Sequence, residues 1–179
     1  MLTEPLPTAL DVRKAAVREA GIRGVLNPAE LQRFRSLLAG DDGAIQVAMR
    51  FSRDEEDRYV IHLDIEADVV VTCQRCLESM PEHLSCENTL AVVWSDRQAA
   101  ALPRHLDPLI LAEQSCNPRD VVEDELILAL RPFSYHDNDA CRERLAAYSD
   151  GPAAEGAGEQ KSNPFDVLAS LKRDTDHQE

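Results

Sequence analysis

The stretch Tyr59–Cys73, which reads YVIHLDIEADVVVTC, decides the fold of this chain. From Tyr59 to Cys73 every second residue is apolar or small, while the residues between them are mostly polar or charged. A period of two sustained over this length predicts a β-strand with one buried face and one face in water. The strand is long for a globular protein, so we expect it to bend or break near Ala67.

Two more stretches with the same period flank this strand. Their apolar positions are Ile45, Val47, Met49 and Phe51 before it, and Leu84, Cys86, Leu90, Val92 and Trp94 after it. A charged turn at 54–57 separates the first pair of strands, and a cysteine-containing turn that runs to Pro81 separates the second pair. Short turns between alternating strands predict an antiparallel β-meander over residues 44–95 with one solvated face.

Helices are expected on both sides of this sheet in the sequence. Residues 8–40 are predicted to be helical, with Asp11 capping a first helix and Asn27 and Glu30 forming a capping box for a second. A third helix, over 120–131, is expected to begin at a capping pattern of Asp120 and Glu123 and to cover the apolar face of the sheet. The fold class is therefore α+β, and residues 95–117 have no clear pattern.

The predicted domain organisation is one α+β domain with a tail. Residues 1–148 form the domain, residues 149–162 are a flexible linker rich in Gly, Ala and Glu, and residues 163–173 are a short C-terminal helical motif. Phe165, Leu168 and Leu171 fall on one face of that motif. Two interpretations stay open, docking of this face on a partner and folding back onto the domain.

Charge favours some partners over others. The net charge is −14, from 33 acidic and 19 basic residues, so the body repels phosphate backbones and favours basic proteins. The alternative interpretation is that the charge merely keeps the protein soluble. Basic residues are relatively frequent near the N-terminus, and direct RNA contact would use Arg13, Lys14, Arg18 and Arg23. With neither a secretory signal nor an apolar run of membrane length, a cytoplasmic location with reduced cysteines is expected.

The five cysteines include a Cys-x-x-Cys pair, Cys73 and Cys76, on the turn between two strands. His136 and Cys141, which follow the third helix, could complete a tetrahedral site, and three sulfurs with one nitrogen suit Zn²⁺. The alternative is a turn filled by two reduced cysteines, with His136 in solvent. A dithiol enzyme would need the pair at the start of a helix, and the sequence after Cys76 favours no helix.

No other pattern indicates catalysis. The chain has no glycine-rich phosphate loop, and His62 has no nucleophile near it in the pattern. Glu123, Asp124 and Glu125 resemble catalytic carboxylates, but we interpret Glu123 as a helix cap and the other two as groups that face water or a partner. All three are candidates for contact with a protein partner. Cys86 and Cys116 are expected to be small buried or loop residues.

Taken together and in this order, several motifs resemble the bacterial YceD family, the large ribosomal RNA subunit accumulation proteins. The matching residues are Leu6-Pro7, Cys73-Gln74-Arg75-Cys76, 122–130, His136-Asp137 followed by Cys141, and Asn163–Lys172. The resemblance spans nearly the whole chain. Some members carry a second cysteine pair where this chain has His136 and Cys141, and this substitution is compatible with a four-ligand site.

The resemblance implies a cytoplasmic protein needed for the synthesis, processing or stability of 23S ribosomal RNA, with no established enzymatic activity. Our leading hypothesis is a non-enzymatic ribosome-biogenesis factor that acts through a basic protein, such as a large-subunit assembly component or an rRNA-processing protein. The alternative is a zinc-knuckle protein that contacts rRNA directly through its N-terminal arginines. A dithiol enzyme is the third hypothesis.

Overall fold

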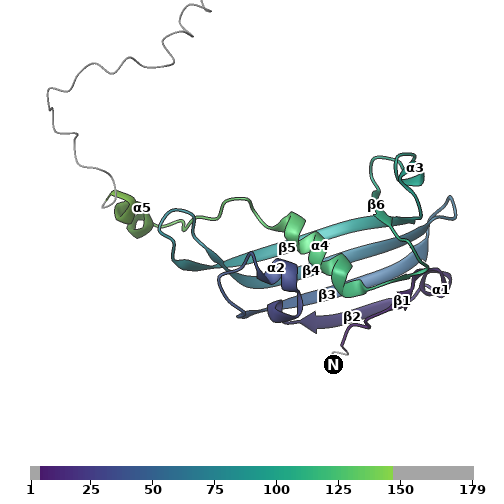
Figure 1. The fold of residues 1–179 in the computed structure, drawn as a ribbon, viewed down its shortest axis with the longest axis horizontal. Coiled ribbons are helices and arrows are strands. Elements are labelled where there is room, and N and C mark those ends of the chain that lie inside the picture. Colours follow the sequence, from purple (N-terminus) through teal and green to yellow (C-terminus); the bar gives the residue numbers. More distant parts are fainter. Residues whose placement is uncertain (1–4, 147–179) are drawn as a thin grey trace, which may run out of the picture. The chain divides into compact units, whose positions relative to one another are not determined.

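The predicted long strand is present in a computed structural model, which describes residues 5–146. It is strand β4 (Tyr59–Thr72), and it runs unbroken through Ala67. β4 lies at the centre of a five-stranded sheet in the order β2-β3-β4-β5-β6 (Figure 1). The other strands are β2 (Gly21–Leu26), β3 (Gly43–Arg53), β5 (Ser79–Val93) and β6 (Asp107–Ile110).

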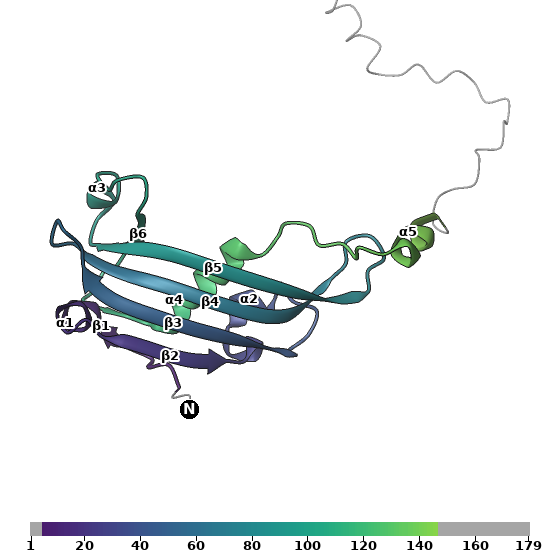
Figure 2. The same cartoon turned by 180° about the vertical axis from the view of Figure 1, so that it is seen from behind.

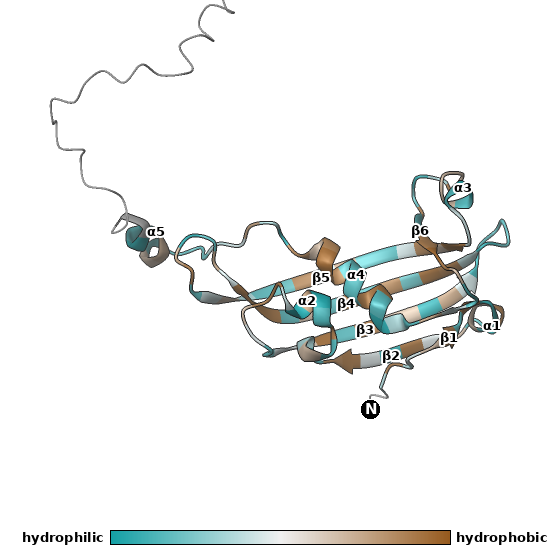
Figure 3. Cartoon of the chain, in the orientation of Figure 1, coloured by the Kyte–Doolittle hydropathy of each residue, from teal (hydrophilic) through white to brown (hydrophobic). Residues whose placement is uncertain are grey.

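The register of the sheet follows the alternation in the sequence. β2 to β5 are antiparallel neighbours, as the meander predicts, and Ile65 on β4 lies opposite Val47 on β3 and Cys86 on β5. Ile45, Phe51 and Ile65 have at most 1% of their surface exposed. The alternation is visible as bands of hydrophobic and hydrophilic residues along the strands in Figure 3.

The helices cover one face of this sheet. α4 (Pro118–Ala129) and the short α2 (Gln32–Arg35) lie in front of the strands in Figure 1 and behind them in Figure 2. α1 (Val12–Val17) and the 3-10 turn η1 (Pro28–Glu30) also pack against the sheet, and Phe34 and Leu126 are completely buried in the shared core. The predicted α+β class is therefore confirmed, with β2 to β5 as the antiparallel part of a mixed sheet.

Smaller elements complete the described part of the chain. β1 (Leu10–Asp11) pairs antiparallel with β7 (Ser115–Cys116), which joins the segment before α1 to the segment before α4. α3 (Asp96–Ala99) precedes β6, which pairs in parallel with β5, and α5 (Asp139–Ala146) is the last described element. None of the helices within residues 5–146 is long and apolar enough to cross a membrane.

The N-terminal prediction is partly wrong. Asp11 caps α1 as expected, and Asn27 and Glu30 form the expected capping box. Residues 21–26 are not helical, however, because they pair along β3 as strand β2. Gly21 and Gly24 favour helix poorly, and Leu26 turns into the core. The capping box starts only a 3-10 turn, because Leu31 leaves the helical region at φ −114° and ψ 88° before α2 begins.

Two other boundaries also differ from their predictions. Asn117 caps α4 by accepting a hydrogen bond from the Arg119 backbone N–H, so the predicted start at Asp120 is wrong by a few residues. Pro81 does not end the cysteine turn, because β5 begins at Ser79 and Pro81 already lies opposite Val70. The linker over 149–162 and the C-terminal motif over 163–173 lie outside the described residues, so that division of the chain stays a prediction.

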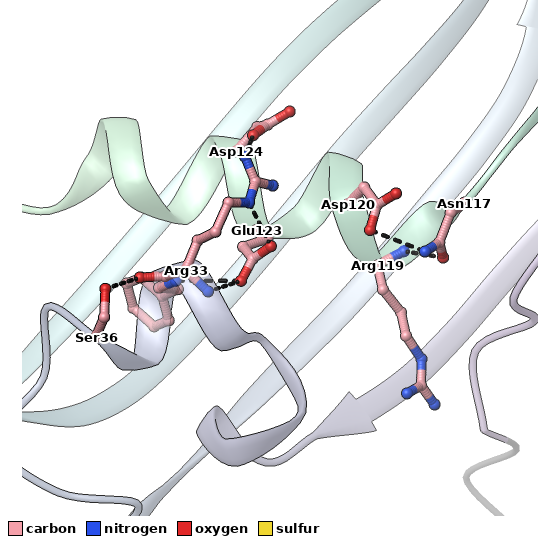
Figure 4. Close-up of polar contacts among 8 residues, drawn as sticks. Arg33, Ser36, Asn117, Arg119, Asp120, Glu123 and Asp124 are labelled. Atoms are coloured by element: carbon pink, nitrogen blue, oxygen red, sulfur yellow. Dashed lines mark hydrogen bonds and ion pairs between the residues drawn. The ribbon is translucent and has the colours of Figure 1, made fainter.

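Glu123 joins two helices rather than capping its own. Its Oε1 accepts hydrogen bonds from the backbone N–H groups of Arg33 (2.6 Å) and Phe34 (3.1 Å) at the start of α2, and its Oε2 accepts from Arg33 Nε (2.8 Å) (Figure 4). α2 has no side-chain cap of its own at this end, so the carboxylate from α4 satisfies its free amides. Burial, the largest influence, raises the pKa of Glu123, but the Phe34 and Arg33 donors outweigh it and hold the pKa below its usual value.

We predict that Glu123→Gln lowers the free energy of unfolding by about 2–4 kcal/mol, because it weakens a buried charged acceptor that serves three donors. Denaturant unfolding at neutral pH measures the change. Asp124→Asn is the matched control. Asp124 binds the same Arg33, but its side chain is 56% exposed, so its loss is expected to cost no more than about 1 kcal/mol.

The difference between wild type and Glu123→Gln should depend on pH with a defined sign. A lowered pKa in the folded state gives stability that is present above the unfolded value, near 4.5, and is lost as the pH falls through the folded value. The difference should therefore shrink on acidification below about 4.5. A difference that stays constant to pH 3, or equal losses in the two variants, would contradict this role for Glu123.

Candidate metal centre and its surroundings

The cysteine turn closes the hairpin between β4 and β5. Thr72 and Ser79 are the last paired residues, and the loop between them is held by hydrogen bonds from Cys73 N–H to Glu78 O (2.8 Å) and from Leu77 N–H to Cys73 O (2.9 Å). Leu77 has a φ of +60°, a left-handed conformation that tightens the turn. The side chains of Cys73 and Cys76 are thereby fixed at the end of a rigid sheet.

The other two predicted ligands come from the segment after α4. This segment returns to the hairpin, where Gln74 N–H donates to Ser134 O (2.9 Å). His136 follows two residues later, and Cys141 lies in the first turn of α5, where its N–H donates to the Asn138 side chain (2.9 Å). The structure therefore brings together the four residues predicted as ligands.

The geometry of the four side chains fits a tetrahedral metal site. The ligand atoms of Cys73, Cys76, His136 and Cys141 all lie within 4.8 Å of one another. Cys73 Sγ and Cys141 Sγ are 3.6 Å apart, and Cys76 Sγ is 3.3 Å from His136 Nδ1. A tetrahedron with Zn–S bonds near 2.3 Å and a Zn–N bond near 2.0 Å has S–S edges of about 3.8 Å and S–N edges of about 3.6 Å. The Cys73–Cys141 and Cys76–His136 separations are close to these edges, and every other pair of donors is within 4.8 Å.

The backbone around the turn favours a thiolate at Cys73. Burial is the largest influence and would raise the pKa of Cys73, but hydrogen bonds from the backbone N–H groups of Cys76, His136 and Arg75 outweigh it and lower the pKa to about 5. Burial and the neighbouring thiols Cys73 and Cys76 raise the pKa of Cys141 instead. Each thiolate in the cluster disfavours a further negative charge on its neighbours. A bound divalent cation would compensate that charge and favour deprotonation of all three thiols.

A thiolate of this kind also bears on the dithiol hypothesis. Cys73 has none of its surface exposed, and it follows a strand rather than opening a helix. A substrate disulfide needs direct access to the attacking sulfur. The lowered pKa of Cys73 is therefore better suited to a metal ligand than to thiol–disulfide exchange.

Two arginines lie around the cluster. Arg75 Nη1 is 3.9 Å from Cys141 Sγ, and its guanidinium stands 5.0 Å over the ring of Tyr135. Arg144 forms an ion pair with Glu78, and that carboxylate is the main cause of the raised pKa of Arg144. Three thiolates and a neutral imidazole around a bound Zn²⁺ would leave one negative charge, which these guanidinium groups would partly compensate. Neither role was predicted from the sequence, although the position of Arg75 between the two cysteines was a usable signal.

The remaining predicted residues do not join this cluster. Of the three carboxylates proposed for partner contact, Glu123 and Glu125 are each only 7% exposed, and Glu125 accepts a hydrogen bond from Asn88 (3.0 Å). Asp124 alone presents its side chain to solvent, so partner contact stays a prediction for Asp124. Phe165, Leu168 and Leu171 lie outside the described residues.

The four N-terminal basic residues are placed in different surroundings. The Arg13 guanidinium stacks 4.5 Å over Trp94, and Lys14 pairs with Asp11 at 3.0 Å. Arg18 is the exposed residue that ends α1, and Arg23 is exposed on β2. Two of the four are therefore engaged within the fold.

The two remaining cysteines behave as expected. Cys116 is buried and Cys86 is partly buried. Burial, aided at Cys86 by the nearby Glu125 carboxylate and at Cys116 by Asp120, raises the pKa of each thiol to about 11. Both thiols are thus kept protonated and unreactive.

Comparison with known proteins agrees with the motifs. Residues 61–172 match the family model described as large ribosomal RNA subunit accumulation protein YceD. Over 169 residues the chain is 32% identical to the large ribosomal RNA subunit accumulation protein YceD of Haemophilus influenzae, and this similarity covers 94% of the chain and 97% of that protein. No solved structure matches the chain.

We predict that the purified protein carries one equivalent of zinc and that Cys73→Ser and Cys141→Ser each lose it, because a closed structural site needs all four ligands. Elemental analysis measures the metal. Cys86→Ser is the matched control, because Cys86 is a partly buried thiol on the adjacent strand that is not one of the four ligands. A metal-free wild type that is fully folded, or equal metal content in all variants, would contradict the site.

Proposed function

The chain belongs to the YceD family of large ribosomal RNA subunit accumulation proteins, and from this membership we propose that it is a ribosome-biogenesis factor. Its role is to support the synthesis, processing or stability of 23S rRNA in the cytoplasm. The observation that carries the proposal is the similarity along almost the full length of both chains, because it includes the sheet, the cysteine turn and the segment that returns to it.

We propose that the protein acts by binding and without catalysis. Cys73 is the described cysteine whose pKa is lowered, and its sulfur is buried beside the side chains of Cys76, His136 and Cys141. A zinc ion held there would tie the β4–β5 hairpin to the segment after α4, as structural zinc sites stabilise small folds. The role of the metal is then to fix the end of the sheet and the place where the chain leaves the domain.

A basic protein is the partner that the charge of the molecule favours. The net charge is −14, and long-range attraction raises the association rate with a positively charged partner such as a ribosomal protein. Asp124 on α4 is an exposed carboxylate for such a contact. The C-terminal motif with Phe165, Leu168 and Leu171 adds a hydrophobic face, as amphipathic docking helices do.

Deleting the gene should lower mature 23S rRNA relative to 16S rRNA, because the factor is proposed to support the large-subunit RNA. Quantitative RNA electrophoresis and subunit profiles measure this ratio. The wild-type gene should restore the ratio, and Cys86→Ser should restore it equally well. Ordinary levels of mature large subunits after deletion would overturn the proposal.

Phe165→Ala combined with Leu168→Ala should reduce the capture of large-subunit assembly proteins by the tagged full-length chain, because the double variant removes most of the apolar face of the motif. Quantitative mass spectrometry of the captured proteins compares it with wild type. Ser170→Ala is the control, since Ser170 falls on the opposite side of the predicted helix from Phe165, Leu168 and Leu171. Unchanged capture would remove the motif as a contact.

A further inference from the structure

The face of the sheet opposite the helices carries a polar groove. In Figure 2 this face looks toward the viewer, and strands β2 to β5 are uncovered along most of their length. The groove has a volume of about 960 Å³. Its charged and titratable lining residues are Arg23, Arg50, His62, Asp64, Glu87 and His105.

The strand register orders these residues in two rows across the sheet. One row runs Gly21, Arg50, His62 and Thr89, and the next runs Arg23, Ala48, Asp64 and Glu87. The cations thus lie on β2 and β3, and the carboxylates lie on β4 and β5. Small residues at Gly21 and Ala48 leave the floor open between the longer side chains.

One end of the groove is closed by the segment that contains α3. Leu102 and Leu106 from this segment pack on Val60 and Ala91, which form a small second core on the face away from the helices. His105, beside Leu106, lines the groove at this end. The groove is therefore closed at this end by the segment that contains α3.

The two arginines are free to bind a ligand. Among residues 5–146 neither Arg23 nor Arg50 forms an ion pair, whereas Arg33 and Arg58 each bind carboxylates of the same chain. They are diagonal neighbours on adjacent strands, with Cα atoms about 7–8 Å apart. Two unpaired guanidinium groups at this spacing suit phosphate oxygens, which arginine binds with paired N–H donors.

The two carboxylates provide complementary acceptors. Asp64 and Glu87 are directly opposite each other and exposed, an arrangement of like charges that weakens a sheet. His62 lies directly opposite Arg50 and two residues before Asp64 on β4, and its ring is held by Ser52 (3.2 Å) and Thr89 (3.2 Å). Carboxylates accept hydrogen bonds from ribose hydroxyls, and a fixed imidazole offers a flat surface for a base.

We propose that this groove binds single-stranded RNA, with backbone phosphates on Arg23 and Arg50 and ribose 2′-hydroxyls on Asp64 and Glu87. The inference rests on the proposed function and deepens it, because it makes RNA itself a ligand beside the protein partner. This site differs from the RNA contact predicted from the sequence, which used the basic residues near the N-terminus. Of those residues only Arg23 lines the groove, where it lies with Arg50, His62 and His105.

The negative charge of the molecule does not exclude this contact. At physiological ionic strength charges farther than about 8 Å are largely screened, so the carboxylates outside the groove weaken binding little. Within the groove Asp64 and Glu87 balance the charge of Arg23 and Arg50, so binding is expected to depend on paired donors and acceptors rather than on net charge. Repulsion from the remainder of the body keeps non-specific nucleic-acid binding low. The groove is thereby expected to be selective for a strand that fits both rows.

The test measures fluorescence anisotropy of labelled single strands of about 12 nucleotides, as RNA and as DNA of the same sequence, with the full-length protein. We expect tighter binding to RNA. Arg23→Gln combined with Arg50→Gln should weaken RNA binding at least about tenfold. The slope of log affinity against log salt should fall in magnitude by about 1.4, or ~0.7 for each lost phosphate contact.

The matched control is Arg97→Gln combined with Arg142→Gln, which changes the net charge equally at two exposed arginines that do not line the groove. It should keep the wild-type affinity within about twofold. Asp64→Asn combined with Glu87→Gln should bring the RNA and DNA affinities closer together, because it weakens the acceptors for the 2′-hydroxyl. Thermal unfolding of each variant checks that the sheet is intact.

Three results would overturn the inference. They are absence of RNA binding by the wild type, equal weakening in both arginine pairs, and an equal rise in RNA and DNA affinity when the carboxylates are replaced. Loss of 23S rRNA after gene deletion together with no RNA affinity of the pure protein would refute the groove and leave the proposed function standing.

Discussion

The register that pairs β4 with β3 on one side and β5 on the other is the constraint on which the rest of the molecule depends. Because side chains alternate across a strand, a slip by one residue would move Ile61, Leu63 and Ile65 into water and bring His62 and Asp64 into the core. The same register defines the polar face, where it sets Arg50 beside His62 and Asp64 beside Glu87. The buried core and the polar groove therefore both follow from the alternation of side chains along the strands.

The register also places the candidate metal centre. Pairing continues to Thr72 and Ser79, so the cysteine turn begins at a fixed point beyond the last rung of the ladder. His136 and Cys141 reach this turn because α4 crosses the apolar face of the sheet. The segment after α4 is then held there by the hydrogen bond from Gln74 N–H to Ser134 O. Glu123 contributes to this route, since it holds α4 against α2 through three hydrogen bonds. A metal at the cluster would therefore stabilise an arrangement that packing already favours, rather than create it.

Periodicity predicted the parts of the fold that a single strand or helix determines. The three central strands, the cap at Asp11 and the grouping of Cys73, Cys76, His136 and Cys141 follow from alternation, capping chemistry and ligand type. The strand at Gly21–Leu26 was missed because an edge strand of six residues has little pattern of its own and is selected by pairing with β3. Glu123 was misread for a related reason. Its partners are the backbone amides of Arg33 and Phe34, far away in the sequence, and an acidic residue near a helix start resembles a local cap.

Charge is distributed in a way that reconciles an acidic protein with an RNA-related role. Many of the arginines in the described part of the chain are bound to nearby carboxylates, as in the pairs of Arg33 with Glu123 and Arg58 with Asp54, and such pairs contribute little field at a distance. The excess carboxylates give the body its long-range attraction for basic proteins, while Arg23 and Arg50 keep their full charge for a ligand at contact distance. Long-range attraction would then favour a basic ribosomal protein, whereas short-range contacts in the groove would bind an RNA strand. The negative charge of the whole molecule attracts the basic protein from a distance. The RNA strand is bound only where the sheet places the unpaired Arg23 and Arg50 beside carboxylates that accept hydrogen bonds from hydroxyl groups.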